Sequence, residues 1–495
     1  MMIILFLPFF LFALNLSEIL SKPKSYVRDF YLTEFIRETN STILAYKAYN
    51  SLYKKKTFKH LRLLAKKDKT FESVYKCVNV MPSYVREVDI SCVLENGLSL
   101  RSMATKLSKE DLKYLYNNLP NSREKRAIKI ILTNDFSKIF KDRELGYYFV
   151  LRYPSKKIDQ YVDDFSIFYG KYFHRFVKLI TLKNLPKLQA SLIKINYKNL
   201  DDKTKWWLFI NALSHNNKKL AKKILYSIHK KNDKIYFWMW KLGNKAILKK
   251  LLKSKRVNFY TLYAYEEANK TFPIKTKIVF NSVKKPKYIQ TNPWYVLNFF
   301  NELKVRKDLF KFAKELDSYK SEALKAIVLD KAFRYKYNFF ITSPIYDDKN
   351  ISFKAFVYAI IRQESRFVPA IVSSAYALGP MQIMPFLVRD YKSNVFKQFN
   401  YNENIKLGVK HLKWLFKNLN DPLMVTYAYN GGIGFVKRSV KPTFKYEGEY
   451  EPFLSIERVL YDESREYGKK VIANYIIYSH LFGDKNITLH KLLKK

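Results

Sequence analysis

Apolar residues recur at helical spacing along much of the chain. The pattern is clearest where Phe353, Val357 and Ile360 follow one another at intervals of four and three residues. Phe356 and Ile361 widen the same face into an amphipathic stripe. This spacing predicts a helix that buries one side in the protein core.

The next position on that stripe is Glu364, so a carboxylate stands where the pattern calls for a buried apolar residue. Ser352 is a candidate N-cap of the helix, and Pro369 predicts that the helix ends close to Glu364. Apolar neighbours and the carbonyl groups of a helix C-terminus both disfavour negative charge, so they favour a protonated acid. The alternative is a helix-end residue that turns out to solvent.

Residues 24–283 alternate amphipathic stretches of eight to fifteen residues with short polar breaks. Stretches 205–213 and 218–229 form one pair, and 236–242 and 245–252 form another. Because each stretch has one apolar face and each pair is joined by a short turn, the pattern predicts stacked helical hairpins of irregular period. Two further breaks follow this array. The first carries prolines at 286 and 293, and the second lies at 343–348.

The composition of the 495-residue chain narrows the classes of function. With 48% hydrophobic and 17% aromatic residues it is not a disordered chain. Its formal charge of +48 suits an anionic partner, such as an acidic polymer, a nucleic acid or a membrane surface. The lysines are scattered along the whole chain, however, so a lysine-rich composition without any role in binding explains the charge equally well. The histidines and cysteines lack ligand spacing, so neither a metal site nor a cofactor is predicted.

The first sixteen residues are strongly apolar and fit the hydrophobic core of an export signal, being short for a membrane span. They lack a preceding Lys or Arg and a clean cleavage site, so a retained anchor is the alternative. In an exported protein Cys77 and Cys92 could pair across a helix-turn-helix, and two buried free thiols are the other possibility.

Three motifs in the last quarter of the chain resemble those of the large soluble lytic transglycosylases, whose catalytic domain is similar to goose-type lysozyme. The first is Glu364-Ser365-x-Phe367-x-Pro369, continued by Ser373, Ala377, Gly379 and Met381-Gln382-Ile383-Met384-Pro385. The second is Ala428-Tyr429-Asn430 with Gly432 and Gly434, and the third is Glu463-Ser464-Arg465-x-Tyr467. Three positions depart from the family pattern, which usually has Gly, Leu and Thr where this chain has Tyr376, Pro380 and Leu387.

The resemblance implies an all-α fold with a ring-like superhelix of helical hairpins, a small linker domain and a lysozyme-like, mostly α catalytic domain. The expected boundaries are a signal peptide at 1–17, the superhelical domain at 18–285, the linker domain at 286–345 and the catalytic domain at 346–495.

The resemblance also implies cleavage of the MurNAc–GlcNAc β-1,4 bond of peptidoglycan by one catalytic residue, Glu364, with 1,6-anhydro-MurNAc ends as products. The expected substrate-binding residues are Ser373, Met381, Gln382, Met384, Ala428, Tyr429, Asn430, Glu463 and Glu457. For Asn430, capping of its helix end is favoured over contact with the substrate. A hydrolytic, lysozyme-type muramidase on the same fold is the alternative.

Other classes fit the sequence less well. A nucleic-acid binder would explain charge and aromatics but not the motifs, and a wall-binding protein without activity would not need Glu364. We therefore expect a periplasmic monomer that binds peptidoglycan glycan strands, with no nucleic-acid partner and with cell-wall synthesis enzymes or peptidases as candidate partners.

Overall fold

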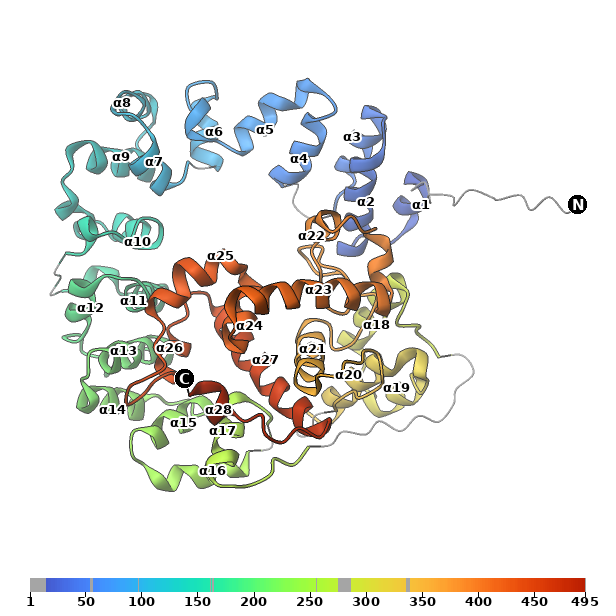
Figure 1. The fold of residues 1–495 in the computed structure, drawn as a ribbon. Coiled ribbons are helices and arrows are strands. Elements are labelled where there is room, and N and C mark those ends of the chain that lie inside the picture. The colour runs from blue at the N-terminus through green and yellow to red at the C-terminus, as the bar shows by residue number, and fades with distance from the viewer. Residues whose placement is uncertain are drawn as a thin grey trace, which may run out of the picture. The chain divides into compact units, whose positions relative to one another are not determined.

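The computed structural model describes residues 15–53, 57–96, 98–160, 162, 164–254, 256–274, 286–334 and 339–494 (Figure 1). These residues form helices, and the only β-type pairing among them is an isolated bridge between Leu378 and Ile383. The predicted all-α fold is confirmed. The apolar run expected to be a signal peptide lies almost wholly outside the described residues. No helix within the described ranges has the length and apolar character that a membrane span requires.

The chain divides into two compact units. The N-terminal unit comprises residues 1–132 with 372–377, and the C-terminal unit comprises 133–371 with 378–495. This division differs from the four segments expected from the sequence, whose boundaries stay predictions.

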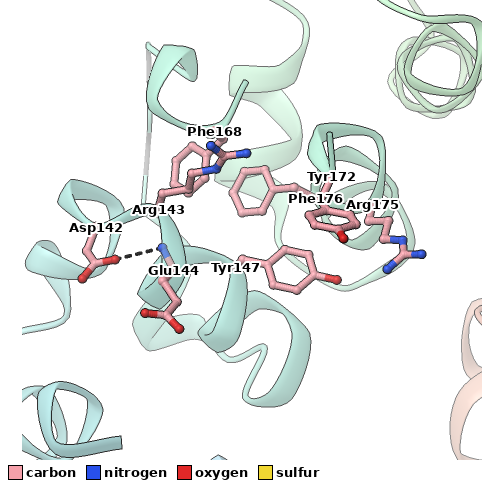
Figure 2. A pocket seen from close by; sticks show the side chains of 8 residues that line it. All are labelled: Asp142, Arg143, Glu144, Tyr147, Phe168, Tyr172, Arg175 and Phe176. Atoms are coloured by element: carbon pink, nitrogen blue, oxygen red, sulfur yellow. Dashed lines mark hydrogen bonds between the residues drawn. The ribbon is translucent and has the colours of Figure 1, made fainter. Parts of the chain in front are cut away.

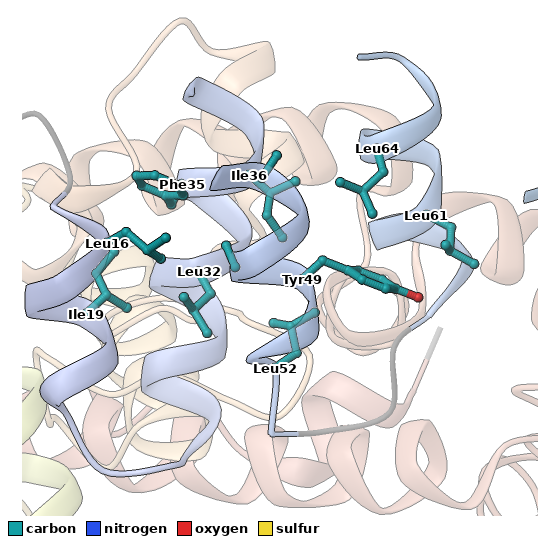
Figure 3. Close-up of a cluster of buried hydrophobic side chains, with 11 residues drawn as sticks. Leu16, Ile19, Leu32, Phe35, Ile36, Tyr49, Leu52, Leu61 and Leu64 are labelled. Carbon is teal, nitrogen blue, oxygen red and sulfur yellow. The ribbon is translucent and has the colours of Figure 1, made fainter. Parts of the chain in front are cut away.

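The N-terminal unit is a succession of short helices. Its helices are α1 (Leu16–Ser21), α2 (Tyr26–Glu38), α3 (Thr42–Asn50), α4 (Phe58–Ala65), α5 (Glu72–Val78), α6 (Ile90–Asn96), α7 (Leu100–Lys106), α8 (Lys109–Asn118) and α9 (Arg123–Thr133). Apolar side chains of the first four pack into one buried cluster, which includes Leu32, Ile36 and Leu64 (Figure 3). Cys77 and Cys92 form a disulfide between α5 and α6, which is the paired alternative of the two left open by the sequence.

The first part of the C-terminal unit continues the helical pattern. It contains α10 (Arg143–Arg152), α11 (Phe173–Leu182), α12 (Pro186–Leu192), α13 (Asp202–Ser214), α14 (Lys218–Ser227), α15 (Asp233–Lys241), α16 (Leu248–Lys253) and α17 (Phe259–Glu267). The helix pairs predicted at 205–229 and 236–252 are present as α13–α14 and α15–α16. Aromatic side chains fill the space between them: the rings of Phe209 and Trp238 lie 5.5 Å apart, and both are fully buried.

The rest of the C-terminal unit carries the motif residues other than Ser373 and its neighbours. Its helices are α18 (Pro293–Val305), α19 (Leu309–Glu315), α20 (Glu322–Ala332), α21 (Ile351–Glu364), α22 (Pro385–Asp390), α23 (Tyr401–Leu419), α24 (Pro422–Gly431), α25 (Ile433–Phe435), α26 (Phe453–Glu457), α27 (Asp462–Leu481) and α28 (Leu489–Leu493). Helices α21 and α27 pack against each other along their length, with the Phe356 and Tyr475 rings 5.2 Å apart. This pairing sets the register between residues far apart in the sequence.

Helix α21 forms where the apolar stripe predicts it and ends at Glu364. Its N-cap, however, is Asn350, whose side chain accepts a hydrogen bond from the Phe353 N–H at 2.9 Å. The expectation that Ser352 caps the helix is wrong, because the Ser352 hydroxyl is bonded instead to the Tyr475 hydroxyl on α27. A tertiary contact thus decides between two good capping residues that stand close together at the helix end.

Candidate active site

Glu364 is the last residue of α21, and its side chain lies largely sheltered from solvent. The Tyr467 hydroxyl on α27 donates a hydrogen bond to its Oε1 at 2.6 Å. Burial raises the pKa of the Glu364 carboxyl from 4.5 to about 7; the Tyr467 hydrogen bond opposes this rise, and the charge of Glu463 adds to it. The carboxyl therefore exchanges its proton near neutral pH, as a general acid and base requires.

Two tyrosines flank this carboxyl. Burial and the charge of Glu364 raise the pKa values of the Tyr429 and Tyr467 phenols well above their usual range, so both keep their protons at neutral pH. The Tyr429 hydroxyl donates to the carbonyl oxygen of Met381 at 2.7 Å. Tyr429 on α24 thereby fixes the loop before α22 beside the carboxyl.

That loop is held in a tight turn. Leu378 and Ile383 exchange two backbone hydrogen bonds, of 3.0 and 2.9 Å. Gly379 between them has a φ of +74°, and a Cβ there would lie 2.1 Å from the Gln398 carbonyl oxygen. Only glycine fits this position, because the conformation is left-handed and the adjacent backbone leaves no space. The turn positions Met381 and Gln382 next to α23 and α24.

The predicted site residues of this loop have different environments. Met381 is fully buried, and its N–H donates to the Asn404 side chain at 2.8 Å. Gln382 has a φ of +50°, and its Nε2 donates to the Gly379 carbonyl at 2.9 Å. Met384 is partly exposed and stands at the N-cap position of α22. Met381 therefore fixes the loop, whereas Gln382 and Met384 reach its surface.

The second and third motifs meet where α24 ends and α27 begins. Asn430 donates from Nδ2 to Glu463 Oε1 at 3.2 Å and accepts from the Ser464 hydroxyl at 2.7 Å. Glu463 is exposed, whereas Ala428 is buried and its carbonyl accepts the Gly432 N–H at 2.8 Å. Two carboxylates thus share this region in different environments: Glu364 is sheltered, and Glu463 is solvated.

The remaining two predicted residues are Ser373 and Glu457. Ser373 belongs to the segment grouped with the N-terminal unit, where its hydroxyl accepts the Ala377 N–H at 2.9 Å. Glu457 is 1% exposed and is bonded to Tyr260 and, at 3.1 Å, to Lys469. In this structure Glu457 is an internal ion-pair residue, which corrects its expected position on a substrate groove.

Two residues of α23, His411 beside Tyr429 and Trp414 beside His411, are not among the predicted site residues. The rings of His411 and Trp414 stack at 5.7 Å, and the His411 ring lies 5.8 Å from that of Tyr429. Trp414 is 44% exposed, so it offers an apolar face next to the candidate site. Both sit on an ordinary amphipathic helix pattern, which does not distinguish a binding surface from a solvated face.

The described residues contain no group of three His, Cys, Asp or Glu side chains suited to hold a metal ion. The groups gathered at this site can transfer protons. The reactive and polar groups of the site are the Glu364 carboxyl with its near-neutral pKa, the protonated phenols of Tyr429 and Tyr467, and the solvated carboxylate of Glu463.

Comparison with known proteins bears on the same residues. Residues 345–451 match the family described as the transglycosylase SLT domain. The chain is 29% identical over 167 residues to a soluble lytic murein transglycosylase of Salmonella typhimurium, which is 32% of this chain and 25% of that protein. It is 29% identical over 142 residues to one of Escherichia coli K12, which is 27% of this chain and 21% of that protein. The aligned parts therefore span a quarter or less of these relatives.

A structural comparison covers more of the chain at low identity. A solved structure of an inactive mutant of the lytic transglycosylase Slt from Pseudomonas aeruginosa matches with a TM-score of 0.47 and 15% identity, over 94% of this chain and 80% of that one.

Proposed function

We propose that this chain, a member of the lytic murein transglycosylase family through its SLT domain at residues 345–451, cleaves the β-1,4 bond between MurNAc and GlcNAc in peptidoglycan. Glu364 is the proposed catalytic residue. The observation that carries this assignment is the sheltered Glu364 carboxyl, which has a pKa of about 7 and accepts a hydrogen bond from Tyr467. Glu364 lies inside the matched range 345–451.

In the proposed reaction Glu364 begins protonated and gives its proton to the oxygen of the bond being broken. Positive charge develops at C1 of MurNAc, where the substrate's own N-acetyl group can stabilise it. Glu364, now a carboxylate, then takes the proton of the C6 hydroxyl, whose oxygen closes on C1. The product carries a 1,6-anhydro ring, and the carboxyl returns to its starting state.

This route needs one carboxyl, whereas most glycosidases use two that flank the bond. Glu463 is the other acid near Glu364, but it is exposed and bonded to Asn430. We assign Glu463 and Asn430 to sugar or peptide binding. Gln382, Met384 and the phenol of Tyr429 are the proposed contacts near the bond, and the buried Met381 helps exclude water.

We place the reaction outside the cytoplasm, in the periplasm. The Cys77–Cys92 disulfide supports an oxidising compartment, since cytosolic thiols are kept reduced. The net charge of +48 suits the anionic cell-wall polymer.

The test is digestion of purified sacculi with wild type, Glu364→Gln and, as a matched control, Glu463→Gln, followed by mass spectrometry of the released ends. We expect Glu364→Gln to fold as wild type by circular dichroism and to release products about 10²–10⁴-fold more slowly. We expect Glu463→Gln to weaken substrate binding while turnover persists. Full activity of Glu364→Gln would reject the assignment, and hydrated reducing MurNAc ends would identify a muramidase instead.

A further inference from the structure

A cavity of about 610 Å³ lies between α10, the 3₁₀ helix Ser166–Phe168 and α11 (Figure 2). None of the candidate site residues described above lines it. Its volume is in the range of small-ligand sites in proteins. The cavity combines aromatic rings with charged side chains, as Figure 2 shows.

The floor of the cavity is rigid and aromatic. The rings of Phe168 and Phe176 stack with 4.2 Å between centroids and 10° between planes, and the two residues are 3% and 2% exposed. A Cβ at Gly146 of α10 would lie 2.7 Å from the Phe168 ring, so a glycine lets the helix approach this close. The floor is therefore preformed before any ligand binds.

The rim exposes further apolar surface. Tyr172, which lines the cavity, is 48% exposed, and Ile167 and Tyr169, the residues on either side of Phe168 in the sequence, are 37% and 43% exposed. Tyr147 on α10 and Tyr172 both carry their hydroxyls on the side of the cavity where the Arg175 guanidinium lies (Figure 2). Exposed aromatic residues gathered beside a cavity are typical of a binding site.

Positive charge surrounds the exposed tyrosine. The Arg175 guanidinium lies 5.1 Å from the centre of the Tyr172 ring, and the Lys171 ammonium lies 5.5 Å from it. In the described part of the chain neither Arg175 nor Arg143 forms an ion pair with a carboxylate. The carboxylate of Asp142 caps α10 by accepting the Glu144 and Leu145 N–H groups at 2.8 and 3.1 Å.

We propose that this cavity binds a saccharide that carries a carboxylate group. The C–H faces of a sugar ring are apolar and pack on aromatic rings such as Tyr172, and hydroxyl groups of the sugar hydrogen-bond to the tyrosine hydroxyls. A guanidinium binds a carboxylate through two parallel N–H···O bonds, which is the strongest polar contact that Arg175, next to the Tyr172 ring, can offer. Binding here requires no turnover at Glu364, so the proposal goes beyond the cleavage reaction.

The test uses hydrogen–deuterium exchange of the full-length Glu364→Gln protein with the disaccharide GlcNAc–MurNAc, whose lactyl carboxylate is free. The matched control ligand is its methyl ester, which has the same sugar rings and no charge. We expect protection of backbone amides in 143–152 and 166–176, with about tenfold weaker binding of the ester.

Substitutions separate the two parts of the proposed contact. Arg175→Gln is expected to bind acid and ester equally, Tyr172→Ala to lose protection by both, and Tyr172→Phe to retain most of it. Because Tyr172 is exposed, its replacement should leave the fold intact. Unchanged hydrogen–deuterium exchange of the amides in α13 and α14 is the check. Three results would each overturn the proposal. They are absence of protection in 143–176, equal protection by acid and ester in the parent protein, and protection by an acidic tetrapeptide in place of the sugar. Protection around Glu364 reports separately on the catalytic assignment.

Discussion

The hydroxyl of Tyr467 donates to Oε1 of Glu364 at 2.6 Å across the interface of α27 and α21. One donor stabilises the carboxylate, while burial and the nearby Glu463 charge stabilise the neutral acid. The balance leaves the pKa at about 7. A carboxyl poised there can give a proton and take one back in the same cycle.

Tyr467→Phe tests this balance. Removal of the hydroxyl takes away the hydrogen bond that favours the carboxylate, so the pKa of Glu364 rises above its value of about 7. Because the proposed reaction begins with the protonated acid, the alkaline limb of the turnover profile should move to higher pH. The measurement is kcat on soluble glycan fragments between pH 5 and 9. An alkaline limb that stays in place or moves to lower pH contradicts this role of Tyr467.

The same carboxyl should make folding stability depend on pH. Its pKa in the folded protein, about 7, is above the ordinary 4.5, so the folded state holds the extra proton between these values. The stabilisation is complete below about pH 4.5 and is lost as pH rises through about 7. Glu364→Gln does not titrate, so it should match wild type at pH 4 and exceed its free energy of unfolding by about 3 kcal/mol at pH 8.

The check is denaturation of the two proteins at pH 4, 6 and 8, followed by a probe in the C-terminal unit. A stability difference that is the same at all three values would show that Glu364 titrates alike in the folded and unfolded states.

Lys469→Met should be strongly destabilising. Burial raises the pKa of the Glu457 carboxyl, but the charge of Lys469, with smaller contributions from its other partners, more than offsets this, so the pKa lies below its ordinary value. Without Lys469 the buried carboxylate loses its main counter-charge, which costs about 3–5 kcal/mol. The double variant Glu457→Gln/Lys469→Met should recover most of the loss. Lys470→Met, at the exposed neighbouring position, is the control and should change stability by about 0.5 kcal/mol or less.

Gly379→Ala should disrupt the loop that carries Gln382. Its φ of +74° strains any other residue, and the added Cβ would lie 2.1 Å from the Gln398 carbonyl oxygen, so strain and collision add. We expect about 4 kcal/mol of destabilisation or more, together with loss of turnover. Gly432→Ala is the matched control, since its φ is +83° but nothing lies within 4 Å of its Cβ, so strain alone should cost about 2 kcal/mol. Equal effects of the two substitutions would exclude the collision.

Local patterns predicted much of the helical architecture and the position of Glu364. A carboxylate that interrupts an apolar stripe is visible within a few helical turns, because the helix repeat alone decides which face is buried. The cap of the same helix is not predictable in this way. Ser352 and Asn350 are both good capping residues, and only the contact of Ser352 with distant Tyr475 distinguishes them.

Contacts between distant segments account for the other differences. Glu457 and Glu463 are close in the sequence, yet one is buried and the other exposed, because Lys469 and Tyr260 enclose the first. The bond from Tyr467 to Glu364 joins residues 103 positions apart, and no local pattern indicates it. The sequence does not decide the Cys77–Cys92 pairing, because two cysteines alone do not reveal whether their helices meet.

Met381 has both of its backbone hydrogen-bonding groups engaged by neighbouring helices. Its N–H donates to Asn404 of α23, and its carbonyl accepts from Tyr429 of α24. Met381 thus ties the loop beside Glu364 to both α23 and α24. Any movement of this loop must therefore carry α23 and α24 along with the loop or break one of these two bonds.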